Sequence, residues 1–188
     1  MEEYTWQDFT IEVFDDNTYT HNSNDNASTY QYHYFNDKDD EYKPAAQHGV
    51  KVFKDGVEIS SCILIGSGGA TGVYGNSAVV HNGQLAVCCC NNVFCLAIPT
   101  LQLWWQIQAD WATCFKIYLI ENDYLVHGEL TISRITTAGE IVWQFSGADI
   151  FVSMDGMVDE CVLNSDNIVL TDFIGNRYFL DYDGKLVG

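Results

Sequence analysis

The sequence is poor in basic residues. It has 8 Lys and Arg against 26 Asp and Glu, which gives a formal net charge of -18 over 188 residues. A surface with this charge repels the phosphates of nucleic acids and the anionic headgroups of a membrane. The composition therefore argues against nucleic acid and membrane as partners, and it favours a positively charged protein or a cation.

Charge is missing altogether from residues 59–109, which contain no Asp, Glu, Lys or Arg. Asn91, Asn92, Pro99 and Gln102 interrupt this stretch. No apolar run therefore reaches the roughly 20 residues that a membrane-spanning helix needs. We predict that the stretch forms a central, buried sheet.

A secretory signal and a CxxC pair are also missing. The first residues, MEEYTWQDF, have neither a basic nor an apolar region, so we expect a cytoplasmic protein. Seven cysteines are an odd number, and this favours reduced, buried thiols over a disulfide framework or a zinc site. If Cys88, Cys89 and Cys90 lie on a strand, the first and third face one side and Cys89 faces the other.

Repetition is the most informative feature that is present. Four segments share a strand-turn-strand pattern: KVFKDGVEIS (51–60), FCLAIPTLQLWWQI (94–107), ISRITTAGEIVWQF (132–145) and RYFLDYDGKLVG (177–188). Their turns centre on Gly56, Thr100, Gly139 and Gly184, which are 44, 39 and 45 residues apart. That period is the size of a propeller blade, and a further hydrophobic strand precedes three of the hairpins. The pattern predicts one all-β domain of repeated antiparallel meanders, with about four blade-like units in a small or incomplete propeller-like architecture.

The segment ISRITTAGEIVWQFSG resembles the repeat of quinoprotein-like (PQQ-type) β-propellers, with Ala138, Gly139 and Trp143 at matching positions. The second hairpin keeps Trp104 or Trp105 but has no Gly in its turn. The resemblance implies blade-like repeats. The metal-liganding set of the quinone enzymes has no counterpart here, so the resemblance implies neither a cofactor nor an enzymatic activity. Full propellers have more blades, which leaves open a homodimer that completes the ring or covers the sheet edges.

The first 43 residues differ in character, since they hold 11 acidic and 2 basic residues. We expect this segment to supply edge strands or loop, with one strand over Tyr4–Phe14. The blade-like repeats then occupy residues 44–188 of a single domain, with Pro44 as the internal boundary.

No motif for catalysis or metal binding stands out. The five histidines are scattered, and the Asp and Asn clusters near the N-terminus lack the Gly and distal Glu of a calcium loop. The loop GSGGATG, Gly66–Gly72, could cradle a phosphate with its backbone amides, but it lacks the Lys and Ser or Thr of a P-loop. A flexible loop between blades is the favoured interpretation.

The leading hypothesis is a non-catalytic protein-binding domain with an acidic surface, and a bacterial inhibitor or immunity-type protein is one concrete form. Its partner-binding residues are predicted to be Asp37, Asp39, Asp40 and Glu41. The alternative is a small-ligand-binding or enzymatic β domain that uses the Gly66–Gly72 loop. Polar groups that converge on that loop in a concave pocket would favour the alternative.

Overall fold

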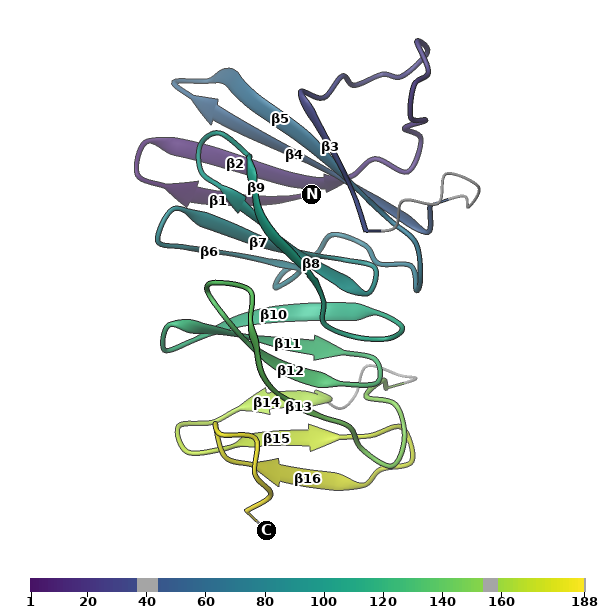
Figure 1. Ribbon diagram of the computed structural model, residues 1–188, viewed down its shortest axis with the longest axis vertical. Helices are drawn as coiled ribbons and strands as arrows, with labels where there is room; N and C mark the ends of the chain where they lie inside the picture. Colours follow the sequence, from purple (N-terminus) through teal and green to yellow (C-terminus); the bar gives the residue numbers. More distant parts are fainter. Residues whose placement is uncertain (37–43, 154–158, 188) are drawn as a thin grey trace.

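Every regular element of the computed structural model, which describes residues 1–36, 44–153 and 159–187, is a β-strand. The strands form four sheets that follow one another along the long axis of the molecule (Figure 1). The sheets remain separate and do not close into a ring. The predicted all-β, propeller-like architecture of about four units is confirmed.

The strands of each sheet have these bounds. The first sheet contains β1 (Glu2–Trp6), β2 (Phe9–Asp15), β3 (Tyr32–Phe35), β4 (Ala46–Lys54) and β5 (Val57–Gly66). The second contains β6 (Ala78–His81), β7 (Gln84–Cys89), β8 (Asn92–Ala97) and β9 (Leu103–Gln108). The third contains β10 (Cys114–Ile120), β11 (Asp123–Gly128), β12 (Ile132–Thr136) and β13 (Ile141–Phe145). The fourth contains β14 (Cys161–Leu163), β15 (Ile168–Thr171) and β16 (Arg177–Leu180).

The last three sheets are plain antiparallel meanders, in which the strands lie in the order of the sequence. The first sheet has the order β1-β2-β4-β5-β3, because the connection from β2 to β4 adds β3 parallel to the outer strand β5. Strands of the acidic N-terminal segment thus pair directly with strands that follow Pro44.

The expected single strand over Tyr4–Phe14 is wrong. The chain forms β1 and β2 instead, which pair in register through a tight turn at Gln7 and Asp8. Gln7 has a φ of 52°, in the left-handed region, and this reverses the chain. Because side chains alternate equally well on both strands of such a hairpin, the sequence pattern does not reveal the reversal.

Apolar side chains fill the three spaces between successive sheets. The second sheet is buried on both faces, since every residue of β8 and all but the first of β7 are buried. The uncharged stretch thus supplies the predicted central sheet. Cys88 faces the third sheet and Cys89 faces the first. Cys90 packs with Cys89 and not with Cys88 as predicted, because β7 ends at Cys89 and Cys90 takes a φ of 54° in the turn.

A tryptophan from one sheet rests on the turn of the next. Trp105 on β9 donates from Nε1 to the carbonyl of Thr137, 2.9 Å away. A Cβ atom at Gly139 would lie 2.7 Å from the Trp105 ring, so only glycine fits beneath it. Trp143 on β13 repeats the arrangement over the turn of the last sheet, with Nε1 3.0 Å from the carbonyl of Tyr182 and the ring against Gly184.

The junction between the first two sheets has no tryptophan at this position. There the Ser60 hydroxyl on β5 donates to the carbonyl of Pro99, and the Tyr34 hydroxyl donates to that of Leu101. No indole has to be accommodated, and this explains why the turn at Thr100 carries no glycine although the turns at Gly139 and Gly184 do. Trp104, the neighbour of Trp105, points outward and is 54% exposed.

An aromatic segment covers the outer face of the first sheet. Tyr19 and Tyr30, from the connection between β2 and β3, pack with Ile63 and Ile65 on the face of β5 that points away from the second sheet. The Tyr30 hydroxyl donates to Asp16 at 2.7 Å. The first sheet is therefore covered on both sides, one by the second sheet and one by this segment.

We predict that Gly139→Ala destabilises the fold more than Gly56→Ala. Both glycines have a left-handed φ, of 85° and 77°, so both substitutions carry a backbone cost of about 1–2 kcal/mol. A Cβ atom meets nothing within 4 Å at Gly56, whereas at Gly139 it collides with Trp105, which adds about 1–3 kcal/mol. Urea unfolding of the two variants measures the difference. Equal losses would show that the tryptophan contact does not contribute to stability.

Candidate functional site

The predicted partner-binding residues Asp37, Asp39, Asp40 and Glu41 lie outside the described residues. The chain on either side of them is held at the end of β5. The amide of Asn36 donates to the carbonyl of Ile65, and the amide of Ala45 donates to that of Gly66, at 3.1 and 2.7 Å.

Two amides of the glycine-rich loop that follows β5 bind to the protein itself. The Ser67 amide donates to the Asn36 side chain at 2.8 Å, and the Gly69 amide donates to the carbonyl of Ala112 at 3.0 Å. A Cβ atom at Gly69 would overlap the Thr113 hydroxyl. The glycines therefore allow the loop to pack closely against the connection into the third sheet, and these amides do not point outward as a phosphate cradle.

Three polar side chains converge where this loop passes the first sheet. Asp15 ends β2, His48 lies on β4 and is fully buried, and Thr71 belongs to the loop. His48 Nε2 lies 3.1 Å from the Thr71 hydroxyl, and its Nδ1 lies 3.1 Å from an Asp15 carboxylate oxygen, although off the axis of a well-aligned hydrogen bond. The sequence pattern missed this cluster, because its members are far apart and none belongs to a recognisable motif.

An acid, an imidazole and a hydroxyl in series also occur in nucleophilic triads. Here the hydroxyl and the carboxylate also accept hydrogen bonds from backbone amides. The Thr71 hydroxyl accepts the amide of Cys90 at 3.0 Å, and the Asp15 carboxylate accepts that of Val73 at 3.1 Å. Burial lowers the pKa of His48, and the nearby Asp15 carboxylate only partly offsets that effect. We interpret the cluster as a joint that fastens the loop to the first two sheets around a neutral imidazole.

We predict that Thr71→Val lowers the free energy of unfolding by about 1–3 kcal/mol, because it leaves His48 Nε2 and the Cys90 amide without their hydroxyl partner. Thr71→Ser keeps the hydroxyl and is the matched control, with a loss below about 1 kcal/mol. Chemical denaturation of both variants checks the prediction. A valine variant as stable as the serine variant would show that the joint is dispensable.

A second buried histidine lies between the last two sheets. His127 on β11 has its Nε2 3.0 Å from the carbonyl of Phe151, and its ring packs edge-on against Phe115. Its Nδ1 has no hydrogen-bond partner within the described part of the chain. Burial lowers the pKa of His127, and the hydrogen bond to the carbonyl of Phe151 only partly offsets that effect.

We predict that the fold loses stability as the pH falls from 6.5 to 5. A histidine with a lowered native pKa binds its proton more weakly when folded, so the unfolded chain takes up protons first and the stability present above pH 6.5 is lost below it. Each such histidine contributes a slope of at most about 1.4 kcal/mol per pH unit. His127→Asn should flatten the profile, because it removes the buried imidazole. Unfolding midpoints over this pH range compare the variant with the unaltered protein, and equal slopes in the two proteins would contradict the prediction.

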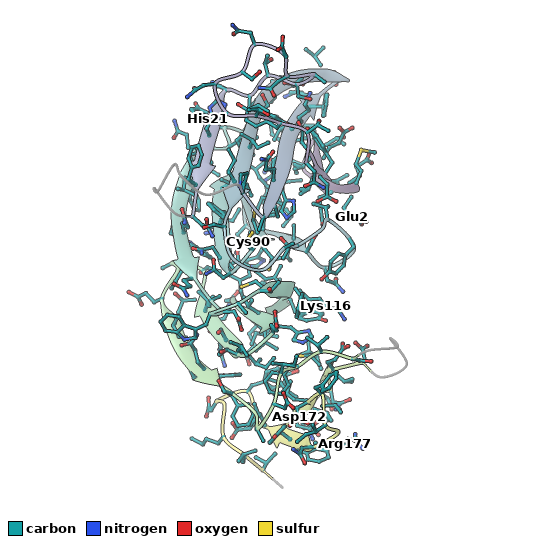
Figure 2. All side chains as sticks on the ribbon, turned by 90° about the vertical axis from the view of Figure 1, so that its right-hand side faces the viewer. Glu2, His21, Cys90, Lys116, Asp172 and Arg177 are labelled. Atoms are coloured by element: carbon teal, nitrogen blue, oxygen red, sulfur yellow. The ribbon has the colours of Figure 1, made fainter. Side chains whose placement is uncertain are left out.

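The two long edges of the array carry different side chains. The hairpin turns on one edge, at the left of Figure 1, are polar, with Asp8, Asp55, Asn82, Glu121 and Asp166 among their residues. The opposite edge faces the viewer in Figure 2, where Cys90, Lys116 and Asp172 mark successive positions along it. We call residues 109–113, 129–131, 146–153 and 172–176 on this edge the loop face.

Large apolar side chains are exposed on the loop face. Trp111 is 80% exposed and Ile174 65%, and Phe173 and Leu130 are exposed as well. Tight turns usually carry polar residues at such positions. Exposed apolar groups gathered on one edge of a highly charged protein therefore require an explanation.

Backbone hydrogen bonds connect the loop face from sheet to sheet. The Glu129 amide donates to Thr113 and the Phe151 amide to Glu129, at 2.8 and 2.7 Å. The Phe173 amide then donates to Ile150 at 2.8 Å. The loops of the last three sheets thus form one continuous surface.

Two buried carboxylates fix the turns that display the apolar residues. Asp110 accepts amides from two neighbouring loops, the connection into β10 and the turn between β11 and β12: those of Ala112, Thr113, Leu130 and Thr131.

Asp172 holds the last turn, accepting the amide and side chain of Asn176 and the hydroxyl of Tyr178. Burial by itself would raise the pKa of Asp172, but these hydrogen bonds lower it below its ordinary value.

No family model and no curated protein matches the chain. Among solved structures, the computationally designed Ika4 protein aligns with a TM-score of 0.50 at 10% identity, over 63% of this chain and 76% of that one. The WD40 domain of Neurospora crassa Pan2 aligns with a TM-score of 0.47 at 9% identity, over 60% and 36% of the two chains. BamB from Moraxella catarrhalis gives 0.45 at 15% identity, over 74% and 42%.

These neighbours are natural and designed propeller proteins, and the similarity to Ika4 supports the propeller-like fold. The chain spans less than half the length of the Pan2 and BamB chains that it matches. Within the described residues, no helix has the length and apolar character needed to cross a membrane.

Proposed function

We propose that the protein is a non-catalytic binding scaffold that engages a positively charged protein. The observation that carries the proposal is the way the few basic residues are used. Six of the 8 Lys and Arg residues lie in the described ranges, since Lys38 and Lys43 fall in 37–43. Five of the six lie within 4.0 Å of a carboxylate: Lys51, Lys54, Lys116, Arg134 and Lys185. The sixth, Arg177, lies over the ring of Phe179.

The consequence is a surface whose unbalanced charge is negative. Local pairing neutralises the cations, and the excess carboxylates remain to create the field that a distant partner experiences. Such a field accelerates encounter with a cationic protein and slows encounter with an anionic one. A bacterial inhibitor or immunity-type protein in the cytoplasm is the specific form of this proposal, with Asp37, Asp39, Asp40 and Glu41 in the binding surface. A homodimer remains part of the proposal.

The alternative of a ligand site at the Gly66–Gly72 loop has less support. Polar groups do converge there, as that hypothesis required. They bind one another and the backbone, however, so the cluster is accounted for as a joint between sheets.

We also infer that the repeats are of the quinoprotein-like kind without its cofactor. The support is that Gly139 and Trp143, the residues that carry the resemblance, both take part in the contact between sheets that recurs along the array. The proposed function needs no cofactor.

We predict that peptides selected on the protein from an unbiased display library carry a net positive charge. Their association rates should fall steeply as ionic strength rises, because salt screens the attraction over about 10 Å at 0.1 M. Neutralising Asp37, Asp39, Asp40 and Glu41 together, to Asn and Gln, should slow association and reduce the salt dependence. Stopped-flow kinetics over a range of salt concentrations measures both effects.

The matched control removes the same charge from scattered exposed positions, through Asp25→Asn, Asp55→Asn, Glu140→Gln and Asp166→Asn. Equal slowing by the two quadruple variants would show that net charge, and not the run at 37–41, guides association. Selection of neutral or acidic peptides would overturn the proposed function.

A further inference from the structure

The loop face combines exposed apolar side chains with negative charge. Glu129 precedes Leu130, Asp149 precedes Ile150, and Asp159 and Glu160 follow on the connection into the last sheet. Two cations lie nearby: Lys116 is paired with Asp159 at 3.3 Å, and Arg177, which follows the last loop, lies over the ring of Phe179. An occupant of this surface has to supply both positive charge and apolar side chains.

The apolar side chains are not exposed through disorder of their loops. Trp111 stands between Asp110 and Ala112, whose amide donates to the Asp110 carboxylate at 2.6 Å. Phe173 follows the buried Asp172, and its own amide is bound to Ile150. A side chain held on a fixed turn loses less conformational freedom on binding than one on a mobile loop. The turns therefore hold these side chains in an exposed position before a partner binds.

The opposite edge provides the internal comparison. It belongs to the same sheets, but its hairpin turns are shorter and carry Asp, Asn and Glu. Solubility and turn chemistry favour polar residues on both edges equally. Exposed apolar side chains elsewhere, such as Val57, Trp104 and Val142, lie on strands, whereas Trp111, Phe173 and Ile174 lie on the loops of this face.

We propose that the loop face, centred on Trp111, is the docking surface for a positively charged polypeptide segment that carries large apolar side chains. Tryptophan in a well-ordered surface is the residue type that most often dominates binding energy, and the acidic rim supplies charge complementarity around it. The inference rests on the proposed function, because it takes the partner to be a cationic protein, and it adds where and through which groups that partner binds.

The test uses two labelled peptides of equal length and equal positive charge. One carries leucine and tyrosine between its arginines, and the other carries only glycine and serine. Fluorescence anisotropy should show tighter binding of the apolar peptide. Trp111→Ala should weaken that binding by roughly tenfold or more. Trp104→Ala is the matched control, since Trp104 is also exposed but lies on the outer strand β9, and it should leave the affinity unchanged.

A second pair of variants tests whether the effect of Trp111→Ala on binding is direct. Ile174→Ser should weaken binding of the apolar peptide, and Val142→Ser, at an exposed position of β13, should not. Circular dichroism confirms that all four variants remain folded.

The other outcomes separate the two proposals. If both peptides bind equally and Trp111→Ala has no effect, the docking surface is wrong while binding through acidic charge stands. If neither peptide binds at low salt, the proposed function fails and the docking surface with it. If the protein sediments as a dimer that Trp111→Ala dissociates, a second copy occupies the loop face, and the docking proposal is overturned.

Discussion

The architecture depends on the contact between an indole ring and the bare backbone of a glycine in the next sheet. Trp105 over Gly139 and Trp143 over Gly184 join consecutive sheets at their outer edge, where the apolar layers between sheets come to an end. The indole N–H donates to a carbonyl of the same turn. The ring thus buries apolar surface while its polar group keeps a hydrogen bond. Sheets in such an array contact only their neighbours, and contacts of this kind make their stabilities interdependent.

Carboxylates have two separate roles in this protein. Asp110 and Asp172 are buried and bind backbone amides on the loop face, whereas most of the other acids in the described ranges are exposed and contribute to the external field. Both roles use the same residue type. A count of acidic residues therefore overstates the negative charge that is free to attract a partner, because it includes the buried carboxylates that hold the turns. The turns held by buried Asp are also those that expose Trp111 and Phe173. The proposed binding surface and the stability of the fold thus have a common physical basis.

The repeat period and the alternation of apolar residues predicted the sheets well, because hairpins are local and each hairpin carries its own signal. The contact of Trp143 with Gly184 was not predictable from the repeat itself, since the pattern places Gly139 and Trp143 in one unit, while in space each contacts the neighbouring sheet. The cluster of Asp15, His48 and Thr71 was missed for a related reason: its members come from two strands and a loop, and only the tertiary fold brings them together. The partner-binding role of Asp37, Asp39, Asp40 and Glu41 remains a prediction.

Tyr19 and Tyr30 cover the outer face of the first sheet, so the two ends of the array of sheets are not equivalent. A repeat unit that carries its own outer-strand tryptophan and turn glycine could be duplicated between the second and fourth sheets, because each junction there follows the same rule. A unit placed ahead of β1 would meet the aromatic cover and find no face to pack against. Lengthening of such a chain, in evolution or by engineering, is therefore confined to one side of its first sheet.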